Sequence, residues 1–507
     1  MSHLIILPIV LPALVAPFII MVLRHHLDLQ RVFSVAACVA LIGLAIALVA
    51  DAATGNITVY ELGNWPAPFG IVLVLDRLSA MMVLLTALLG LVVVLYAIWS
   101  RWDERGRHFH ALMQFQLMGV LGAFLTGDAF NLFVFFEVLL IASYGLMIHG
   151  GGGERLRAGV QYVVYNLVGS TLFLFALGTI YAVTGTLNMA DIAVKVAEIA
   201  PEDTALLRVG AVLLLLVFAV KAAVLPLHFW LPAAYANAPA PVAAFFAIMT
   251  KVGAYAIFRM YTLTFGPEQA ATSGVADGWL LYAALLTVTV GMIGVLGAKD
   301  IARMTAFAAI GSTGTLLIAI SLFDQTSAAA AIYYMVHSTL SAAFLFLVVD
   351  LVVERRGSAI ETAPPMQNNG VIATLYFAAA VAIAGMPPLS GFLGKILVMD
   401  AARTHDQAVL VWAVILITSL VAILGLARAG SLIFWKAYDA STPVPETAEL
   451  PDPDINTRPM IAVFALLSAI VLLTVFAGPV MQYAEATAAQ LYDPSDYIDA
   501  VLKREAN

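Results

Sequence analysis

The stretch Phe218-Ala-Val-Lys221-Ala-Ala-Val-Leu-Pro226-Leu-His228 combines an apolar run, a lysine in its interior and a proline about one turn later. The apolar run extends from Leu206 through Ala234, which is too long for one simple membrane crossing. Proline inside a helix removes a hydrogen bond and clashes with the preceding turn. The sequence therefore predicts a helix that is broken near Pro226.

The composition of the whole chain indicates a membrane protein. Of 507 residues, 62% are hydrophobic and 11% are charged, whereas soluble domains carry about 25% charged residues. A helix satisfies its own backbone groups in hydrocarbon, so the long apolar runs predict an all-α integral membrane protein. The single cysteine, Cys38, excludes an internal disulfide and a cysteine-ligated metal cluster.

About fourteen apolar segments are long enough to be read as transmembrane helices. Residues 482–507 are polar and are interpreted as a tail. The segments are 4–23, 31–50, 78–99, 109–127, 129–149, 159–182, 206–228, 240–264, 278–298, 302–323, 328–353, 371–402, 408–435 and 459–481.

A second broken segment suggests an internal repeat. The run from Val371 through Ala402 contains Gly385 and Pro387-Pro388, and it lies five segments after the first broken one. Matched Gly/Pro-interrupted helices in two halves of a transporter point to the ion path. Because each unit has an odd number of helices, the second copy is expected to be inverted. The predicted parts are 1–108 (three helices), 109–264 (first five-helix unit, helices 4–8), 278–437 (its inverted repeat, helices 9–13) and 438–507 (loop, last helix and tail).

Orientation follows from the Lys and Arg residues of the loops, which accumulate on the cytoplasmic side. Even-numbered loops carry only Arg77, Lys195, Arg208 and Arg403, and the remaining loop cations lie in odd-numbered loops. We therefore expect the odd loops in the cytoplasm and both termini on the outer side.

Ionisable side chains at membrane depth are costly, and this makes them functional candidates. Glu137 lies near the middle of the fifth segment and needs a cation. Lys221 is expected to pair with it, with His228 on nearly the same helical face. Because burial disfavours the charged form of a lysine, moving this pair apart or together changes how tightly Lys221 holds its proton. A static buried ion pair is the alternative.

Three further residues are candidates for a proton relay, namely Lys251, His337 and Lys395. His337 is followed by Ser338, Thr339 and Ser341, a polar stripe that can hold water, although a buried histidine can also be purely structural. Lys395 follows the second break and is read as the positional counterpart of Lys221. Arg259 lies two turns further on than Lys251, toward the outer end of the segment, where an arginine can simply snorkel to the interface.

Three acidic residues near segment ends are weaker candidates. Asp300 lies beside Lys299 and Arg303, where a solvated loop cluster is an equal alternative. Asp350 and Asp400 are read either as ligands for an ion at the ends of the path or as ordinary interfacial residues.

Several classes of function lack support in the sequence. There is no phosphate-cradling Gly-Lys-Ser/Thr loop, no cluster with metal-ligand spacing and no nucleic-acid signature. We therefore expect no cofactor and no nucleic-acid partner.

At these motifs the chain resembles the antiporter-like subunits shared by Mrp-type multisubunit cation/proton antiporters and respiratory complex I. Its length and details look most like the D-type member of the Mrp (Pha, Mnh) antiporter set. The motifs are Phe135-Phe136-Glu137, Lys221 with Pro226-Leu-His228-Phe-Trp230-Leu-Pro232, Lys251-Val-Gly-Ala-Tyr255, Lys299-Asp300-Ile-Ala-Arg303-Met and Pro387-Pro388-Leu-Ser-Gly-Phe-Leu-Gly-Lys395.

The resemblance implies a central polar axis that couples the Glu137–Lys221 pair to Lys251, His337 and Lys395. Many family members carry a lysine four residues after the histidine, where this chain has Ser341. It also implies a bacterial inner (plasma) membrane location, the lipid bilayer and other membrane subunits as partners, and H⁺ with Na⁺ or K⁺ as the ions moved.

Two alternatives remain open at this point. One is a proton-pumping subunit of complex I or a related membrane hydrogenase, whose redox chemistry lies in other subunits. The other is a structural subunit whose buried charges only lock the assembly.

Overall fold

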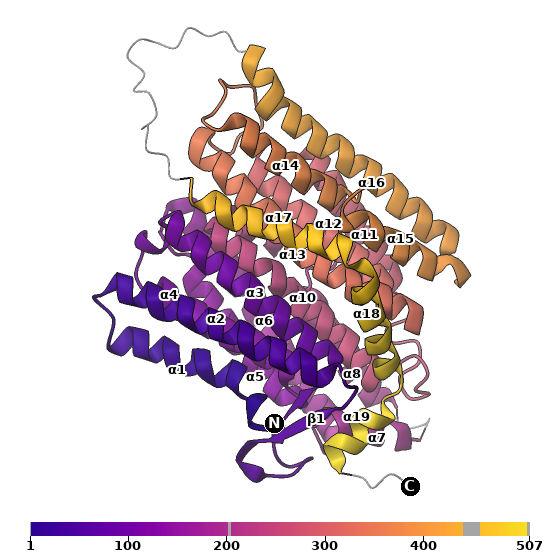
Figure 1. Cartoon of the computed structure of the whole chain (residues 1–507). Helices are drawn as coiled ribbons and strands as arrows, with labels where there is room; N and C mark the ends of the chain where they lie inside the picture. Colours follow the sequence, from indigo (N-terminus) through magenta and orange to yellow (C-terminus); the bar gives the residue numbers. More distant parts are fainter. Residues whose placement is uncertain (1, 201–203, 440–456, 504–507) are drawn as a thin grey trace.

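The computed structural model describes residues 2–200, 204–439 and 457–503. It is a bundle of helices that run roughly side by side (Figure 1). The long helices are α1 (Leu7–Met21), α2 (Leu27–Ala52), α3 (Arg77–Trp99), α4 (Phe109–Leu125), α5 (Ala129–Met147), α6 (Gly153–Thr184), α8 (Ala205–Lys221), α10 (Ala240–Leu263), α11 (Leu280–Gly297), α12 (Ile301–Ser321), α13 (Gln325–Arg356), α14 (Asn369–Ala384), α15 (Ser390–Ala401), α16 (Ala408–Gly430), α17 (Pro459–Val475) and α18 (Ala477–Tyr492).

The remaining elements are short. They are helices α7 (Met189–Glu198), α9 (Trp230–Asn237) and α19 (Ser495–Leu502), and an antiparallel hairpin of β1 (Thr58–Glu61) and β2 (Val72–Leu75). Single 3-10 or π turns occur at Ser2–Leu4, Leu62–Asn64, Trp102–Glu104, Ala402–Thr404, Ser431–Trp435 and Lys436–Asp439.

Every predicted apolar segment contains a helix or a broken pair of helices. Among the described residues, nine helices are long and apolar enough to cross a membrane, or ten if the α17–α18 pair, bent by 76°, is one span. Helices α1, α4 and α14 are apolar but shorter. The all-α membrane fold is confirmed, and fourteen crossings remain a prediction.

The break near Pro226 is present, and nearby side chains satisfy the backbone groups that it frees. Helix α8 ends at Lys221 and α9 begins at Trp230. The N–H of Leu225 donates to Thr287 Oγ1 at 2.9 Å, and the Trp230 indole donates to the Val220 carbonyl at 3.0 Å. Because a buried unpaired backbone group is costly, these bonds let the helix stay open at membrane depth.

The predicted repeat is supported by matching features of α4–α10 and α11–α16. The third helix of each unit, α6 and α13, has 32 residues. The second helix of each unit is capped by an aspartate, Asp128 for α5 and Asp300 for α12. Each aspartate also forms an isolated β-bridge with the segment that follows the third helix, to Asn188 and Ala359 respectively. The fourth member of each unit is the broken one, α8–α9 and α14–α15.

Reading residues 482–507 as a polar tail was incomplete. Helices α18 and α19 occupy most of this range and bury Ala484, Ala488, Tyr497 and Val501. They are amphipathic surface helices, which an apolar-run search passes over because their average composition is polar.

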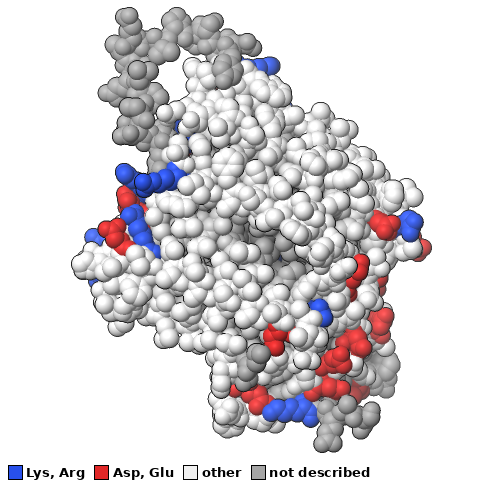
Figure 2. All heavy atoms as spheres, viewed as in Figure 1, with Lys and Arg blue, Asp and Glu red and all other residues white. Residues whose placement is uncertain are grey.

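Charges lie at the two rims of the molecule with an uncharged surface between them. Figure 2 shows most of the visible Lys and Arg at the left rim and most of the visible Asp and Glu at the lower right. The start of the chain lies on the same side as α19, where Lys503 pairs with Glu61 at 2.8 Å (Figure 1). Both described ends therefore share one side, as an even number of crossings requires.

Candidate functional site

Glu137 lies in the middle of α5 and points toward α6. It is half-buried, and its Oε1 accepts a hydrogen bond from Ser170 Oγ of α6. On the same faces, Ile141 of α5, four residues after Glu137, and Leu167 of α6, three residues before Ser170, are exposed at 65% and 59%. Glu137 is thus within reach of both this chain's interior and whatever packs on the α5–α6 surface.

Lys221 reaches α6 from the end of α8. Its Nζ lies 3.2 Å from Asn166 Oδ1 and 3.5 Å from the Asn166 carbonyl, and its side chain is buried. Gly169 of α6 faces this lysine, where an added Cβ would lie 3.7 Å from Nζ. The ammonium therefore packs directly against α6 at van der Waals distance from this position.

The expected direct contact between Glu137 and Lys221 is not formed in this conformation. The two are linked through one face of α6, because Asn166 and Ser170 are four residues apart and bind one partner each. Glu137 is nevertheless near enough for its charge to act on Lys221. Helix α6 therefore separates the two charges without isolating them.

The expected shared face of Lys221 and His228 is wrong. The helix ends at Lys221, so helical spacing does not apply across residues 222–229. His228 is buried in the break, and its Nδ1 has no hydrogen-bond partner among the described residues.

Lys251 is fully buried in α10, and its Nζ lies beside two threonine hydroxyls. Its Nζ lies 3.4 Å from both Thr250 Oγ1 and Thr313 Oγ1 of α12. Within the described part of the chain, no carboxylate lies within 4.0 Å of the Nζ of Lys221, Lys251 or Lys395.

His337 connects α13 to the second broken helix. Its Nδ1 lies 2.9 Å from Ser390 Oγ in the first turn of α15. Gly391 lets α15 pack closely on α14 and on His337, since an added Cβ would lie 2.0 Å from the Ala382 carbonyl of α14 and 3.0 Å from the imidazole. The polar stripe is buried, and Ser338 accepts from Ser312 of α12 at 2.8 Å while Ser341 contacts the Ser338 carbonyl at 3.5 Å.

Lys395 of α15 turns back onto the end of α14. Its Nζ donates to the Ala384 carbonyl and to Ser419 Oγ of α16, both at 2.8 Å. The carbonyl end of a helix carries a partial negative charge, so the break supplies a site for an ammonium. Lys395 lies after the break in its helix pair, whereas Lys221 lies before the break in its own. Each lysine therefore lies beside a broken helix, but the two do not occupy equivalent positions in the repeat.

These groups form a row of short polar contacts across the molecule. Along the row, the contacts join α6 to both α5 and α8, then α10 to α12, α12 to α13, α13 to α15, and finally α15 to both α14 and α16. Lys251 and Lys395 are both close enough for their charges to act on His337. A proton that crosses between these contacts needs intervening water.

The weaker acidic candidates lie away from this row. Asp300 is a helix cap that accepts from the Arg303 N–H at 2.8 Å. Asp400 is exposed and lies 3.6 Å from Arg403. Asp350 is buried and accepts from the Tyr96 hydroxyl at 2.7 Å and the Trp102 indole at 3.0 Å.

Asp350 also lines a cavity of about 640 Å³ among the odd-numbered loops. The inner wall of this cavity includes Tyr235 and Ala243. Ala243 precedes Lys251 by eight residues of α10, a rise of about 12 Å. The cavity therefore extends from the surface toward the central lysine.

Sequence reasoning missed Asn166 and Ser170, which hold the two members of the central pair. The available signal for this site was a pair of polar residues, four positions apart, in an otherwise apolar segment. It was also wrong about Arg259, which does not snorkel. Arg259 Nη1 pairs with Asp76 Oδ2 at 2.6 Å, and both side chains are buried.

Comparison with known proteins decides the family. The family model described as NADH:quinone oxidoreductase/Mrp antiporter, TM matches residues 126–421, which include all five residues of the row. The chain belongs to this family. Within the NADH:quinone oxidoreductase/Mrp antiporter family, the D-type subunit of a probable K(+)/H(+) antiporter of Rhizobium meliloti is 39% identical over 99% of this chain and 98% of its own length.

Two further members of the family match along the whole chain. The D-type subunit of an Na(+)/H(+) antiporter of Bacillus subtilis is 38% identical over 99% of this chain and 100% of its own. A chain of the Mrp complex from Dietzia sp. DQ12-45-1b is 28% identical with a TM-score of 0.87, covering 99% of this chain and 100% of that one. The predicted resemblance to the D-type Mrp subunits is confirmed.

Proposed function

We propose that this chain is the ion-translocating D-type subunit of a multisubunit monovalent cation/proton antiporter in a bacterial cell membrane. Protons pass along Lys251, His337 and Lys395, and the Glu137–Lys221 pair couples that movement to a neighbouring subunit. The relatives named for K⁺/H⁺ and for Na⁺/H⁺ exchange are about equally similar to this chain, so the proposal covers both cations.

One observation carries this proposal: three lysines are buried at membrane depth beside hydroxyl and carbonyl oxygens, without a neighbouring carboxylate in the described structure. A buried ammonium without a counter-ion is unfavourable, whereas the neutral amine is tolerated. Such a lysine can gain and lose a proton with a small change in free energy. The neighbouring hydroxyl and carbonyl oxygens can accept a hydrogen bond from either the ammonium or the neutral amine.

The half-buried position of Glu137 suits the coupling role. A neighbouring subunit on the α5–α6 surface can present a charge to Glu137, and Glu137 can then swing between that charge and Lys221. The cavity that contains Asp350 offers access from the odd-loop side toward Lys251.

The test compares Glu137→Ala and Lys221→Ala with Glu485→Gln, a control at an exposed acid of α18 away from the row and from the Asp350 cavity. We expect the first two variants to lose cation-dependent proton exchange in inverted membrane vesicles while the complex still assembles, and the control to keep it. Full exchange in either of the first two variants would reject the pair as the switch.

The alternative is a proton-pumping subunit of a redox-driven complex, since the family description includes NADH:quinone oxidoreductase. Co-purification separates the two functions. Small antiporter subunits would support the proposal, and quinone-binding or iron–sulfur subunits would support the alternative. A purely structural role would leave exchange intact when Lys251 or Lys395 is replaced.

A further inference from the structure

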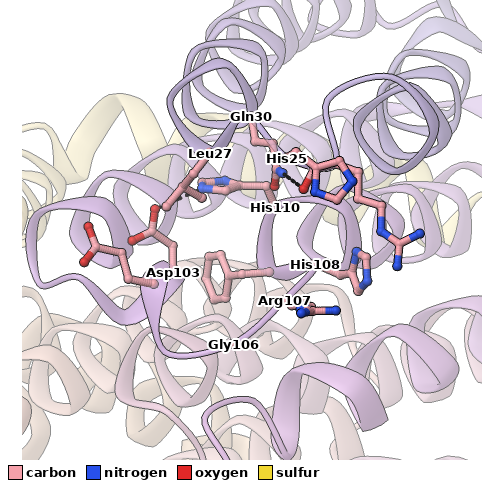
Figure 3. A pocket seen from close by; sticks show the side chains of 11 residues that line it. His25, Leu27, Gln30, Asp103, Gly106, Arg107, His108 and His110 are labelled. Atoms are coloured by element: carbon pink, nitrogen blue, oxygen red, sulfur yellow. Dashed lines mark hydrogen bonds and ion pairs between the residues drawn. The ribbon is translucent and has the colours of Figure 1, made fainter.

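A cationic pocket lies at the rim of the molecule, far from the row of buried lysines. It has a volume of about 240 Å³ and lies between the α1–α2 turn and the start of α4 (Figure 3). Its lining includes Arg24, His25, Arg107 and His108, of which the two arginines and His25 are exposed. In Figure 3, His25, Arg107 and His108 lie on one side of the pocket and Asp103 on the other, with His110 between them.

The two acidic residues of the lining are already paired. Arg31 donates to Asp103 through Nε at 2.6 Å and through Nη2 at 3.1 Å, and it also contacts Glu104 at 2.7 Å and Asp28 at 3.3 Å. His110 Nε2 lies 3.2 Å from Asp103 Oδ2. By contrast, Arg24 and Arg107 form no ion pair with any residue of the described ranges. The charged groups of the lining that are free to meet a ligand are therefore these two arginines.

Two further features of the pocket favour an anion. His110 is fully buried and lines the pocket, and its Nδ1, which donates to an anion when both ring nitrogens carry a proton, has no partner within the described structure. Helix α4 starts here with Phe109 and His110, and no side chain caps it. The first N–H groups of a helix have no partner within that helix and favour negative charge, so they can bind a phosphate.

The surface next to the pocket is apolar and lies at the membrane boundary. Met21, Val22 and Val32, on the two sides of the α1–α2 turn, are exposed at 83%, 59% and 61%. Phe18 and Phe33 meet across the two helices with ring centroids 5.1 Å apart. A ligand whose phosphate enters the pocket therefore places its attached chains against this surface.

We propose that the pocket binds the phosphate of an anionic phospholipid, whose acyl chains lie along α1 and α2. Arg24 and Arg107 contact the phosphate, His25 and His108 border it, and His110 and the start of α4 face it from inside. Basic pockets between membrane helices on the Lys/Arg-rich side are suited to anionic headgroups. This site does not depend on the proposed ion path, and it fixes the N-terminal helices to one leaflet.

The experiment uses the whole assembly, purified through a tag on this chain and exchanged into mixed micelles of phosphatidylglycerol and phosphatidylcholine. Native mass spectrometry then gives the ratio of the two lipids bound. The Arg24→Gln/Arg107→Gln double variant is compared with Arg101→Gln/Arg157→Gln, which removes the same charge from two exposed positions outside the pocket.

We expect wild type and the control to favour phosphatidylglycerol, and the double variant to lose about fivefold of this preference per arginine, or about 25-fold for the pair. An unchanged preference in the double variant, or an equal loss in the control, would overturn the site. Inorganic phosphate is added as a competitor. Failure to displace the lipid supports the proposal, whereas complete displacement would assign the pocket to a soluble anion and overturn the lipid assignment.

Discussion

At the scale of single residues, the hydroxyl groups between the charges have a testable role. Ser390 is the only described partner of His337 Nδ1, at 2.9 Å, and one such bond is worth about 0.5–1.5 kcal/mol. If His337 carries protons, Ser390→Ala should lower the exchange rate about two- to tenfold with assembly unchanged. Ser321→Ala is the control, because this buried hydroxyl bonds only to the Ile318 carbonyl of its own helix. Equal rates in the two variants would remove Ser390 from the relay.

The sequence predicted which residues are candidates for function better than it predicted which side chains they contact. Glu137, Lys221, Lys251, His337 and Lys395 stand out because a charge or imidazole in an apolar run is unusual. Asn166 and Ser170 do not stand out, because neutral polar residues are common in membrane helices. The distance between Glu137 and Lys221 depends on how α5, α6 and α8 pack, and helical spacing within one segment carries no information about that.

At the scale of elements, close helix contact at Gly391 positions His337 against α15. Alanine there would place its Cβ 2.0 Å from the Ala382 carbonyl of α14 and 3.0 Å from the His337 imidazole, so α15 must move away from α14. Overpacking of this kind costs about 1–3 kcal/mol. We expect Gly391→Ala to lower the thermal stability of the purified assembly and to reduce exchange.

Gly370 provides the matched control for this substitution. It lies at the start of α14, and an added Cβ would meet nothing within 4 Å. Gly370→Ala should leave both stability and exchange unchanged. Equal melting temperatures for the two variants would show that the α14–α15 contact tolerates a side chain and would contradict the predicted clash at Gly391.

A second element-scale contact is the buried pair of Asp76 and Arg259, which links the start of α3 to α10. Removing one partner leaves a buried charge, so Arg259→Met should destabilise the assembly by about 3–5 kcal/mol. Replacing both residues, as Asp76→Leu/Arg259→Met, should recover most of that loss. Unfolding measured in detergent for the three proteins tests this, and a double variant as unstable as the single one would contradict it.

The same pair gives a pH dependence with a defined sign. Burial raises the pKa of Asp76, but the Arg259 guanidinium and the hydrogen bonds with Ser79 outweigh this effect and hold the pKa below its usual value. A carboxyl with a lowered folded pKa stabilises the protein above its unfolded pKa of about 3.9, and this contribution disappears as pH falls through the folded pKa. The wild-type assembly should therefore lose more stability on acidification than the double variant does.

Helices were predicted well where their apolar composition alone determines that they form. The breaks in α8–α9 and α14–α15 follow from proline and glycine inside apolar runs. The β1–β2 hairpin was not predicted because each strand has only four residues. Helices α18 and α19 were not predicted because their residues are mixed in polarity and gain their structure by packing on the bundle.

At the scale of the whole molecule, the orientation in the membrane is open to a direct test. In a Cys38→Ser background, Arg157→Cys marks an odd-numbered loop and Glu268→Cys an even-numbered one, and both positions are accessible to solvent. The excess of Lys and Arg in odd loops predicts that a membrane-impermeant maleimide labels Glu268→Cys in intact cells and Arg157→Cys only after permeabilisation. The reverse pattern would invert the proposed direction of proton access.

If buried lysines pass protons across the molecule, removing the amine of Lys251 should stop proton transfer, because Lys251 lies between the two halves of the row. The measurement is cation-dependent proton exchange in inverted vesicles for Lys251→Met, with Lys195→Met, at an exposed surface lysine, as the control. Exchange in Lys251→Met should fall to background while the assembly purifies intact and Lys195→Met behaves like wild type. Wild-type exchange in an intact Lys251→Met assembly would contradict proton transfer through Lys251.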